Sequence, residues 1–388
     1  MDYLMLIDRV RRRNPTAPEA QFLVSGCDQV IRRSVLRSIL LDCQQAGDSL
    51  IVVDDTGGAV DYGVFAACGY PIQNGFTAGT CLYNPFQVET LQDMGRTRRL
   101  LTLLGYSEKE TGKFFSYLQF LRHLETLKSG GQTPLLTVQT IGNYTTVPAM
   151  EEQLQALVDT GIIDERQQRM LLAKYMECSC AAADFEDQLF LLLPFLSGQP
   201  LEQQPGQVLV FPTGSLGEDI QIRRIALQLV QFWLETRPDN RMTLILFDRG
   251  YGEREFLCEF LLSLPPFMRV HLFSEDAFTL CGNDMLAMLL GRFPARVYGR
   301  HAAMASAEAV ERVCGEIDVI QHAYNVTYDR HMASNRPWDL LLGRNKAETY
   351  AQTAPVREPR YRKEMILSFP QGQGIVDYMG NCSLFSVS

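Results

Sequence analysis

The sequence contains no run of about 18 apolar residues, the length at which a helix can cross a bilayer. Its beginning, MDYLMLIDRVRRRNP, is too short and too charged to act as a secretory signal. With 46% hydrophobic and 21% charged residues, the composition is that of an ordinary globular protein. We therefore expect a soluble, cytosolic chain without a transmembrane segment, and 388 residues allow two or three domains.

Patterns for metal ligation and for hydrolytic catalysis are also missing. The five histidines show no metal-ligand spacing, and neither H-E-x-x-H nor G-x-S-x-G occurs. The ten cysteines are scattered, and only Cys178 and Cys180 lie close together, which by itself is weak evidence for a metal. We expect reduced, mostly buried thiols and no bound metal.

The chain lacks an excess of basic residues. Its 36 Lys and Arg stand against 45 Asp and Glu, for a formal net charge of -9. This balance argues against a continuous basic surface that wraps nucleic acid. Local basic groups occur at 11–13 and at Arg32, Arg33 and Arg37, and we interpret them first as solvated faces or contacts to an acidic partner. DNA stays open as a partner but is not the expected one.

What is present is an alternation of short apolar runs and helical patterns. The apolar runs predict buried parallel strands at 21–25, 49–53, 207–212, 242–248, 268–274 and 295–300. Apolar residues at helical spacing predict helices between them, at 30–44, 217–237, 253–264 and 306–315, with Ser306 opening the last one. Such alternation indicates a doubly wound α/β sheet with right-handed crossovers and helices on both faces.

The middle of the chain has a different character. Residues 88–187 are helical by pattern, with an apolar stripe in FFSYLQFLRHLETL (114–127). A Gly-rich break follows at 129–132, and Pro148 then lies in the first turn of another helix, where proline is tolerated. Because this block interrupts the strand–helix alternation, we predict that it is an all-α insertion.

Several motifs occur in one collinear series along this framework. LYNPF (82–86) is close to an N-P-F/L signature, and SLIVVDDTGG (49–58) to a strand followed by D-P-K-G. ILFDRG (245–250) is similar to the start of a D-E-F-x-x-x-G region, and VREPRYRKEMILSFPQGQGIVDYMG (356–380) to a C-terminal segment ending in G-x-G-I-V. Over residues 22–378 the chain thereby resembles the soluble ATPase region of type IV secretion and conjugation coupling proteins, the TraG/TraD group of the FtsK/HerA superfamily.

The resemblance implies a RecA-like P-loop NTPase fold, with a mostly parallel sheet and helices on both faces. It divides the chain into a nucleotide-binding-type domain, residues 1–87 and 188–388, and an all-α insertion domain, residues 88–187. The family's transmembrane pair and acidic C-terminal tail have no counterpart in the sequence. In the family, a phosphate-binding loop follows the first strand, and a second motif binds magnesium and activates water.

The segment FLVSGCDQVIRRS (22–34) stands at the place of that loop, whose pattern is G-x-x-x-x-G-K-[ST]. Counted from Gly26, Ile31 replaces the second glycine and Arg32 the lysine. Arg33 replaces the hydroxyl residue, and Ser34 comes one position late. A β-branched residue fits a glycine conformation poorly, and a planar guanidinium does not replace a compact ammonium in a tight loop. Gly26, Arg32, Arg33 and Ser34 are therefore predicted to be remnants of a phosphate site.

The second motif departs from the family in the same direction. Asp248 stands at the magnesium position, but Arg249 replaces the glutamate that activates water. The family's sensing glutamine is missing, because its place falls near Phe273 or Ser274, and Asp55 and Gly58 are what is left of D-P-K-G. We predict that Asp55 and Asp248 are remnants of the nucleotide site. For the strand-end aspartates Asp54, Asp55 and Asp248, two interpretations stay open, an acidic cluster or a set of helix caps and loop carboxylates.

Together these replacements predict a pseudo-ATPase with no catalytic residues and no cofactor. Binding of ATP and Mg²⁺ is not expected, but the sequence leaves it open. The predicted function is a scaffold or partner-binding component in conjugative DNA transfer or type IV secretion. Its partners would be proteins of that machinery, including an intact coupling ATPase. It would be cytoplasmic, or peripheral at the inner face of the membrane through a partner. The alternatives are a divergent, active DNA-translocating ATPase and a nucleotide-sensing module without turnover.

Overall fold

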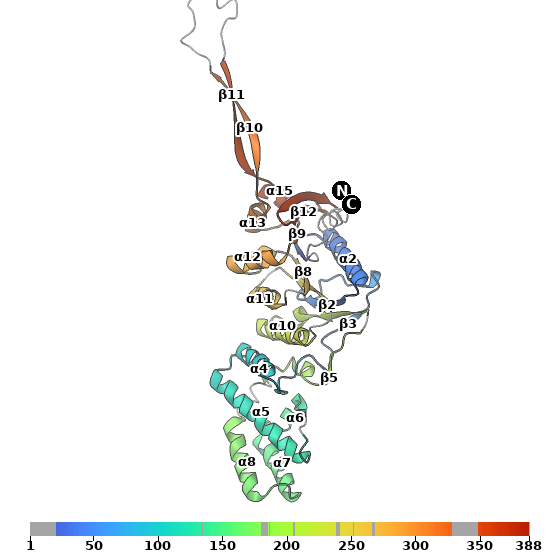
Figure 1. Cartoon of the computed structure of the whole chain (residues 1–388), viewed down its shortest axis with the longest axis vertical. Coiled ribbons are helices and arrows are strands. Elements are labelled where there is room, and N and C mark those ends of the chain that lie inside the picture. Colours follow the sequence, from blue (N-terminus) through green and yellow to red (C-terminus); the bar gives the residue numbers. More distant parts are fainter. Residues whose placement is uncertain are drawn as a thin grey trace, which may run out of the picture.

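The computed structural model describes residues 21–387, except 133–134, 180–184, 186, 205, 238–240, 251, 266–267 and 328–347. The molecule is elongated. Figure 1 shows a large sheet flanked by helices in the middle, a group of helices at one end, and a two-stranded ribbon that extends from the other end. Among the described residues, no helix combines the length and the hydropathy needed to span a bilayer.

Within the described residues, nine strands form one large sheet in the order β13-β12-β9-β1-β8-β7-β2-β6-β3. The parallel strands are β1 (Phe22–Ser25), β2 (Ser49–Asp54), β3 (Ile72–Asn74), β6 (Val208–Phe211), β7 (Met242–Asp248), β8 (Arg269–Ser274) and β9 (Ala295–Tyr298). At one edge, β12 (Gln373–Tyr378) pairs antiparallel with β9, and β13 (Asn381–Ser386) pairs antiparallel with β12. The six strands predicted from apolar runs are confirmed.

Successive residues of the central strands point to opposite faces of the sheet and enter two different hydrophobic clusters. In β1, Phe22 and Val24 join the cluster of helix α2, whereas Leu23 joins the cluster of helices α10 and α11. One face is covered by α2 (Gln29–Ala46) and α3 (Gly63–Ala67). The other is covered by α10 (Ile220–Glu235), α11 (Glu255–Ser263) and α12 (Asn283–Arg292), as Figure 1 shows. Burial on both sides explains why the strands are continuous apolar runs.

The helical content predicted for residues 88–187 is confirmed over the described part of that range. The helices are α4 (Leu91–Leu103), α5 (Glu108–Lys128), α6 (Val138–Gly142), α7 (Val147–Asp159) and α8 (Glu165–Cys178). Three of them begin with a capping box, formed by Thr90 and Asp93, by Ser107 and Glu110, and by Asp164 and Gln167. Such boxes satisfy amide groups that would otherwise lack partners, so these starts are encoded locally.

The helical region and the sheet share one hydrophobic core. Phe86 lies beside Phe114 and Phe185, with ring centroids 6.4 and 5.6 Å away, and Tyr83 lies 4.8 Å from Phe232 on α10. These rings belong to the same cluster of buried residues as Leu23 and the other strand residues that point to that face of the sheet. The division into domains at 88 and 187 stays a prediction, because the core continues across that boundary.

The shorter elements connect these parts. They are β4 (Thr80–Cys81), β5 (Gln199–Pro200), which pairs with β4, the helix α15 (Lys363–Leu367), and the 3-10 turns η1 (Leu193–Phe195), η2 (Thr213–Leu216) and η3 (Ala277–Thr279). Helices α13 (Met304–Cys314) and α15 pack with β9 and β12 around a third, smaller cluster. This cluster supports the antiparallel edge of the sheet.

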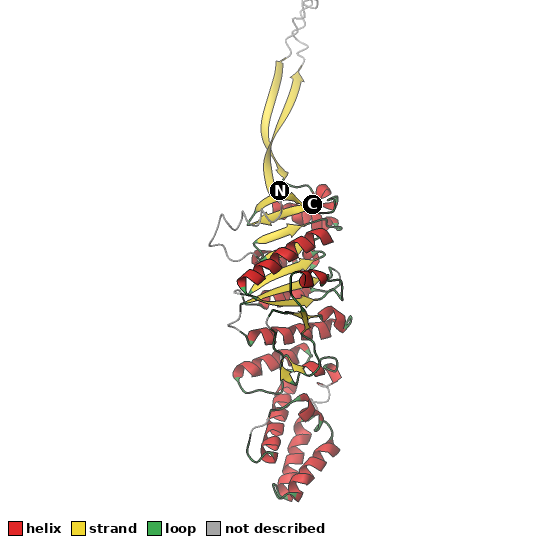
Figure 2. Ribbon diagram, turned by 90° about the vertical axis from the view of Figure 1, so that its right-hand side faces the viewer, coloured by secondary structure: helices red, strands yellow, loops and turns green. Residues whose placement is uncertain are grey.

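The ribbon at the end of the molecule consists of β10 (Glu316–Thr327) and β11 (Glu348–Pro359), which pair antiparallel along their whole length. We call these two strands the arm. The arm extends away from the sheet in both Figures 1 and 2. The sequence patterns did not predict the arm. Residues 329–347 show no clear period in the sequence, which predicts a loop, and they lie outside the described residues.

One predicted boundary is wrong. Helix α13 begins at Met304, so Ser306 does not open it but lies inside its first turn. The Ser306 hydroxyl instead donates a hydrogen bond of 2.6 Å to Oδ2 of Asp276. The sequence predicts that this serine caps its own helix, but in the folded chain its hydroxyl has a tertiary partner. Helix α12 was not predicted at all.

Candidate functional site

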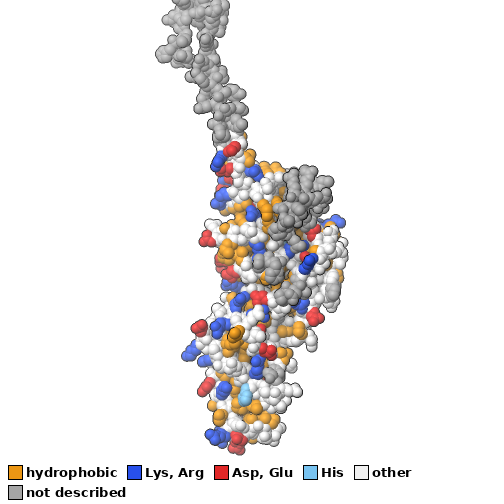
Figure 3. All heavy atoms as spheres, in the orientation of Figure 1, with side chains coloured by type: hydrophobic (Ala, Val, Ile, Leu, Met, Phe, Trp, Pro, Cys, Tyr) orange, Lys and Arg blue, Asp and Glu red, His pale blue; other side chains and the backbone are white. Residues whose placement is uncertain are grey.

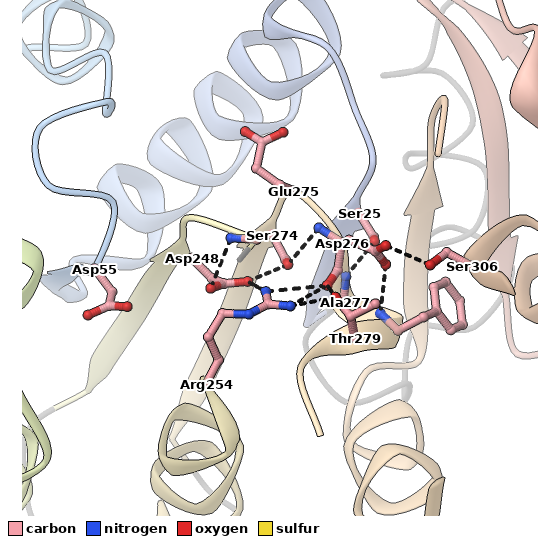
Figure 4. A network of polar contacts seen from close by, with 12 residues as sticks. Ser25, Asp55, Asp248, Arg254, Ser274, Glu275, Asp276, Ala277, Thr279 and Ser306 are labelled. Atoms are coloured by element: carbon pink, nitrogen blue, oxygen red, sulfur yellow. Dashed lines mark hydrogen bonds and ion pairs between the residues drawn. The ribbon is translucent and has the colours of Figure 1, made fainter. Parts of the chain in front are cut away.

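The predicted site residues gather at the carboxyl ends of the parallel strands. Strands β1, β8, β7 and β2 are neighbours in the sheet, so Gly26, Asp248 and Asp55 come to one edge, together with the end of β8. The amide of Asp55 donates to the carbonyl of Phe247, 2.9 Å away. Figure 4 shows the residues that surround this edge. Ligands of open α/β sheets bind at such an edge, which makes it the candidate site.

The loop between β1 and α2 is short and closed by an aspartate. Asp28 is the N-cap of α2, and its Oδ1 accepts hydrogen bonds from the amides of Val30 and Ile31, at 2.9 and 3.0 Å. Its Oδ2 accepts a third bond, 2.6 Å long, from the amide of Gly372. The first amides of a helix are the groups that bind a phosphate in a P-loop. Here a carboxylate of the chain itself takes that position.

Gly26 is covered by the ring of His301. The glycine has a φ of 64°, and a Cβ placed there would lie 2.7 Å from the imidazole. The Gly26 amide donates to the carbonyl of Glu275, 3.1 Å away. The glycine is therefore needed for a left-handed turn and for close contact with His301, whatever else the loop does.

Arg32 and Arg33 lie on α2 but point to different partners. Arg32 forms an ion pair of 2.6 Å with Glu275, which follows β8, and donates to the carbonyl of Ser274. Arg33 forms an ion pair of 2.7 Å with Asp61, which precedes α3. Ser34 is half-buried in the same helix. Arg32 thus reaches the candidate site, whereas Arg33 contacts the loop before α3.

Asp55 is held by a buried arginine that sequence reasoning did not find. Arg223 on α10 donates from Nε to Oδ1 of Asp55 at 2.9 Å, and its Nη2 contacts Oδ2. Both side chains are fully buried, and Thr213 donates a further bond of 3.1 Å. Burial raises the pKa of the Asp55 carboxyl, and the adjacent guanidinium opposes that rise. The sequence does contain one indication that Arg223 is buried, because this arginine lies among the apolar residues of α10.

Asp248 is held in the same way by Arg254. Nη1 of Arg254 lies 2.5 Å from Oδ2 of Asp248, and both side chains are buried. The same oxygen accepts a bond of 2.6 Å from the Ser274 hydroxyl, while Oδ1 accepts one of 3.2 Å from the Gly250 amide. Arg254 also contacts Thr279, as Figure 4 shows. Both oxygens of Asp248, the carboxylate predicted for the magnesium position, thus have hydrogen-bond partners within the chain.

Asp54 accepts hydrogen bonds from the loop that follows β2. Its Oδ1 accepts a bond of 2.9 Å from the amide of Thr56, and its Oδ2 accepts one of 2.6 Å from the Tyr62 hydroxyl. Of the two interpretations of the strand-end aspartates, this favours loop carboxylates for Asp54. Among the described residues, no group of three or more His, Cys, Asp or Glu side chains is arranged to hold a metal ion.

A serine and a histidine meet beside this edge. The Ser25 hydroxyl lies 3.0 Å from Nε2 of His301 and accepts a bond of 2.9 Å from the amide of Ala277. Nδ1 of His301 lies 3.2 Å from the carbonyl of Gly299, which can only accept, so Nδ1 carries the proton. Burial lowers the pKa of His301, and Asp276 opposes this effect. Both Ser25 and His301 are at most 1% exposed, so the pair is buried and links the end of β1 to the loop that follows β9.

Solved structures match this architecture over nearly its whole length. The bacterial conjugative coupling protein TrwB, in an unbound form, matches 95% of this chain and 85% of its own, with a TM-score of 0.52 and 15% identity. The chain has a type IV coupling ATPase-like fold. The plasmid coupling protein TrwB in complex with ADP and Mg²⁺ gives a TM-score of 0.51, 16% identity and the same coverage. VirB4 of Thermoanaerobacter pseudethanolicus gives a TM-score of 0.51 at 12% identity, and the match covers 95% of this chain and 89% of the VirB4 chain.

No protein-family model matches the sequence, and no curated protein matches it either. The coupling ATPase-like fold confirms the predicted RecA-like class and its mostly parallel sheet. The roles of Gly26, Arg32, Arg33, Ser34, Asp55 and Asp248 as remnants of a nucleotide site stay predictions.

Proposed function

We propose that this chain is a scaffold with a coupling ATPase-like fold that neither binds nor hydrolyses nucleotide. It would act within conjugative DNA transfer or type IV secretion. The observation that carries the proposal is the buried pair of Asp248 and Arg254. In this fold Asp248 stands where a magnesium ligand is expected, and an arginine of the same chain supplies the positive charge there.

The charge of Arg254 argues against a metal at this position. A guanidinium stays protonated at every physiological pH, so Mg²⁺ would have to approach Asp248 beside a fixed positive charge. Moving Arg254 aside would leave one buried charge without its partner, which costs about 3–5 kcal/mol. Asp55 is paired with Arg223 in the same manner, so a second carboxylate of the edge is also neutralised.

The start of α2 gives the same indication for phosphate. The amides of Val30 and Ile31 already donate to Asp28, and the carboxylate would repel an anion placed near them. Glu275 pairs with Arg32, the cation expected to reach a phosphate. The residues at this edge therefore do not fit a nucleotide with its Mg²⁺.

The proposed partners follow from the fold. Matching structures are a conjugative coupling protein and VirB4, so proteins of conjugation or secretion machinery, an intact coupling ATPase among them, are the proposed partners. DNA is a weaker candidate, because the formal net charge is -9 and, on the one face that Figure 3 shows, positive and negative side chains are interspersed. The proposed location is the cytoplasm, with membrane attachment through a partner.

Calorimetric titration of the full chain with ATP, and then ADP, in the presence of Mg²⁺ tests the central claim. We expect no heat of binding and no shift in melting temperature. Asp28→Asn is an informative companion, because asparagine keeps the N-cap but removes the charge. We expect this variant to show no heat of binding either, since Arg254 still forms its ion pair with Asp248. Micromolar binding by the wild type would overturn the proposal, and DNA-stimulated turnover that needs Asp248 would favour the translocase alternative.

A second experiment tests the scaffold role. The tagged full chain is expressed in its native host and its bound proteins are identified, with the tag alone as the control. We expect a coupling ATPase, a relaxase or another secretion protein to be retained. Recovery of none of these would contradict the scaffold role even if nucleotide binding were absent.

A further inference from the structure

The arm has no third strand beside it among the described residues. Its twelve-residue strands give it a length of about 40 Å, at about 3.4 Å per residue. An isolated pair of strands is only marginally stable in water, and each outer edge exposes amides and carbonyls that can pair with another strand. The arm is therefore a candidate for pairing with a further strand.

The positions of two prolines distinguish the edges of the arm. Pro355 and Pro359 lie on β11, opposite Ile320 and Glu316 of β10. Proline has no amide hydrogen, so it fits where the amide would point away from the partner strand. In an antiparallel pair such positions alternate, and the two prolines are four residues apart in an unbroken register, so they belong to the same outward-facing set. The outer edge of β11 is thus interrupted twice.

The outer edge of β10 has no such interruption. By the same alternation, its outward-facing amides belong to Glu316, Asp318, Ile320, His322, Tyr324 and Val326. None of these residues is proline, so the edge offers a continuous row of donors and acceptors. An incoming strand can therefore form its full set of bonds on β10 but not on β11.

The distribution of charge along β10 favours one direction of pairing. Glu316 and Asp318 lie exposed at its base, and residues 319–327 contain no Asp, Glu, Lys or Arg. Edge strands usually carry charges that prevent association, and this stretch has none. Two copies of β10 that pair antiparallel place the acidic base of each against the uncharged half of the other. Parallel pairing would set the like charges side by side.

We propose that the arm joins two copies of this chain through β10. The two β10 strands pair antiparallel about a two-fold axis and form a four-stranded sheet in the order β11-β10-β10-β11. A two-fold axis makes this contact self-complementary, so no other sequence is needed to complete it. The inference concerns assembly and is independent of whether the candidate site binds nucleotide.

Sedimentation velocity of the full chain over a range of concentrations tests the proposal with a matched set of variants. Tyr324 and Ala351 lie opposite each other in the register, and both amides point outward. Tyr324→Pro removes a donor from the outer edge of β10 and spares the bonds within the arm. Ala351→Pro does the same to the outer edge of β11, and Tyr324→Ala controls for the loss of the tyrosine side chain.

We expect dimers for the wild type, Tyr324→Ala and Ala351→Pro. For Tyr324→Pro we expect the dissociation constant of the dimer to rise about tenfold or more, because the substitution removes two equivalent hydrogen bonds, one on each side of the two-fold axis. Hydrogen exchange on the wild type gives a readout without any variant. Exchange in 316–327 should slow as the concentration rises, whereas 348–359 should not change. Three results would overturn the proposal: a monomer at all concentrations, a dimer whose dissociation constant does not change in Tyr324→Pro, or a dimer that is weakened by Ala351→Pro.

Discussion

At the scale of single residues, two arginines define the candidate site. Arg223 and Arg254 place delocalised, weakly hydrated cations against Asp55 and Asp248, which suits a buried position better than a compact ammonium would. Removing one partner of such a pair is costly, whereas replacing both can be almost neutral. This difference gives a test of whether the aspartates are structural.

The first prediction concerns Asp248→Asn. We expect the free energy of unfolding to fall by about 3–5 kcal/mol, because Arg254 loses its buried counter-charge. Urea denaturation measures the change, and the double variant with Arg254→Met should recover much of the loss. Asp61→Asn is the matched control. It breaks a partly exposed ion pair with Arg33 and should cost less than about 1 kcal/mol. Equal effects of the two asparagine variants would show that the buried pair is not special.

The second prediction concerns pH and His301. Its pKa in the folded protein is lowered by burial, so the unfolded chain takes up a proton first as the pH falls below about 6.5. Stability from this neutral histidine is therefore present above that pH and lost below it. Urea denaturation at pH 7.5 and pH 5.5 should show a smaller pH dependence in His301→Gln than in the wild type. His123→Gln, on the exposed side of α5, should not change it. Identical pH dependence in all three proteins would contradict this assignment.

At the scale of elements, the start of α2 couples two distant segments. Asp28 caps the helix and also accepts from Gly372, which precedes β12. The cap therefore fixes the loop before the antiparallel edge as well as the helix. Most caps act only on their own helix, as Asp219 does at α10.

The third prediction compares these two caps. Asp28→Ala should lower the free energy of unfolding by about 2 kcal/mol, the upper part of the usual range for an N-cap, because the bond to Gly372 is lost too. Asp219→Ala, which loses one bond to Gln221, should cost about 1 kcal/mol. Thermal and urea denaturation of the two variants measure the difference. A larger effect at Asp219 would argue against the bridging role of Asp28.

The elements that could be predicted are those whose buried faces give the sequence a recognisable pattern of apolar residues. Strands such as β2 and β7 are apolar throughout because both faces are covered, and α10 has a clear helical stripe. The arm could not be predicted, since a ribbon outside the core carries no burial pattern. The partner of Asp55 could not be predicted, for a different reason. Arg223 lies 168 residues from Asp55, so only the folded chain brings them together.

At the scale of the whole molecule, the shared core sets the unit of unfolding. Phe86 is 2% exposed and lies between the end of the sheet region and helix α5. The rings around it belong to one cluster that also contains the strands. Cooperative loss of that cluster would make the helical region and the sheet unfold together.

The fourth prediction follows for Phe86→Ala. We expect a loss of about 3–5 kcal/mol and a single transition in calorimetry that moves as a whole. Leu91→Ala is the control, because Leu91 is 87% exposed and should change stability by less than about 0.5 kcal/mol. Two transitions, of which only one moves, would instead mean that residues 88–187 unfold as the separate domain predicted from the sequence.

The arm has a mechanical consequence as well. It leaves the body at Gly315, directly after α13, and returns at Arg360, whose amide donates to the Gly315 carbonyl at 2.9 Å. Its direction is thus set by a few residues at one end of a rod of about 40 Å. A turn of about 10° at that base would carry the far end through about 7 Å, by the geometry of a rod of this length. Small changes in the packing of α13 would therefore be amplified into large displacements at the opposite end.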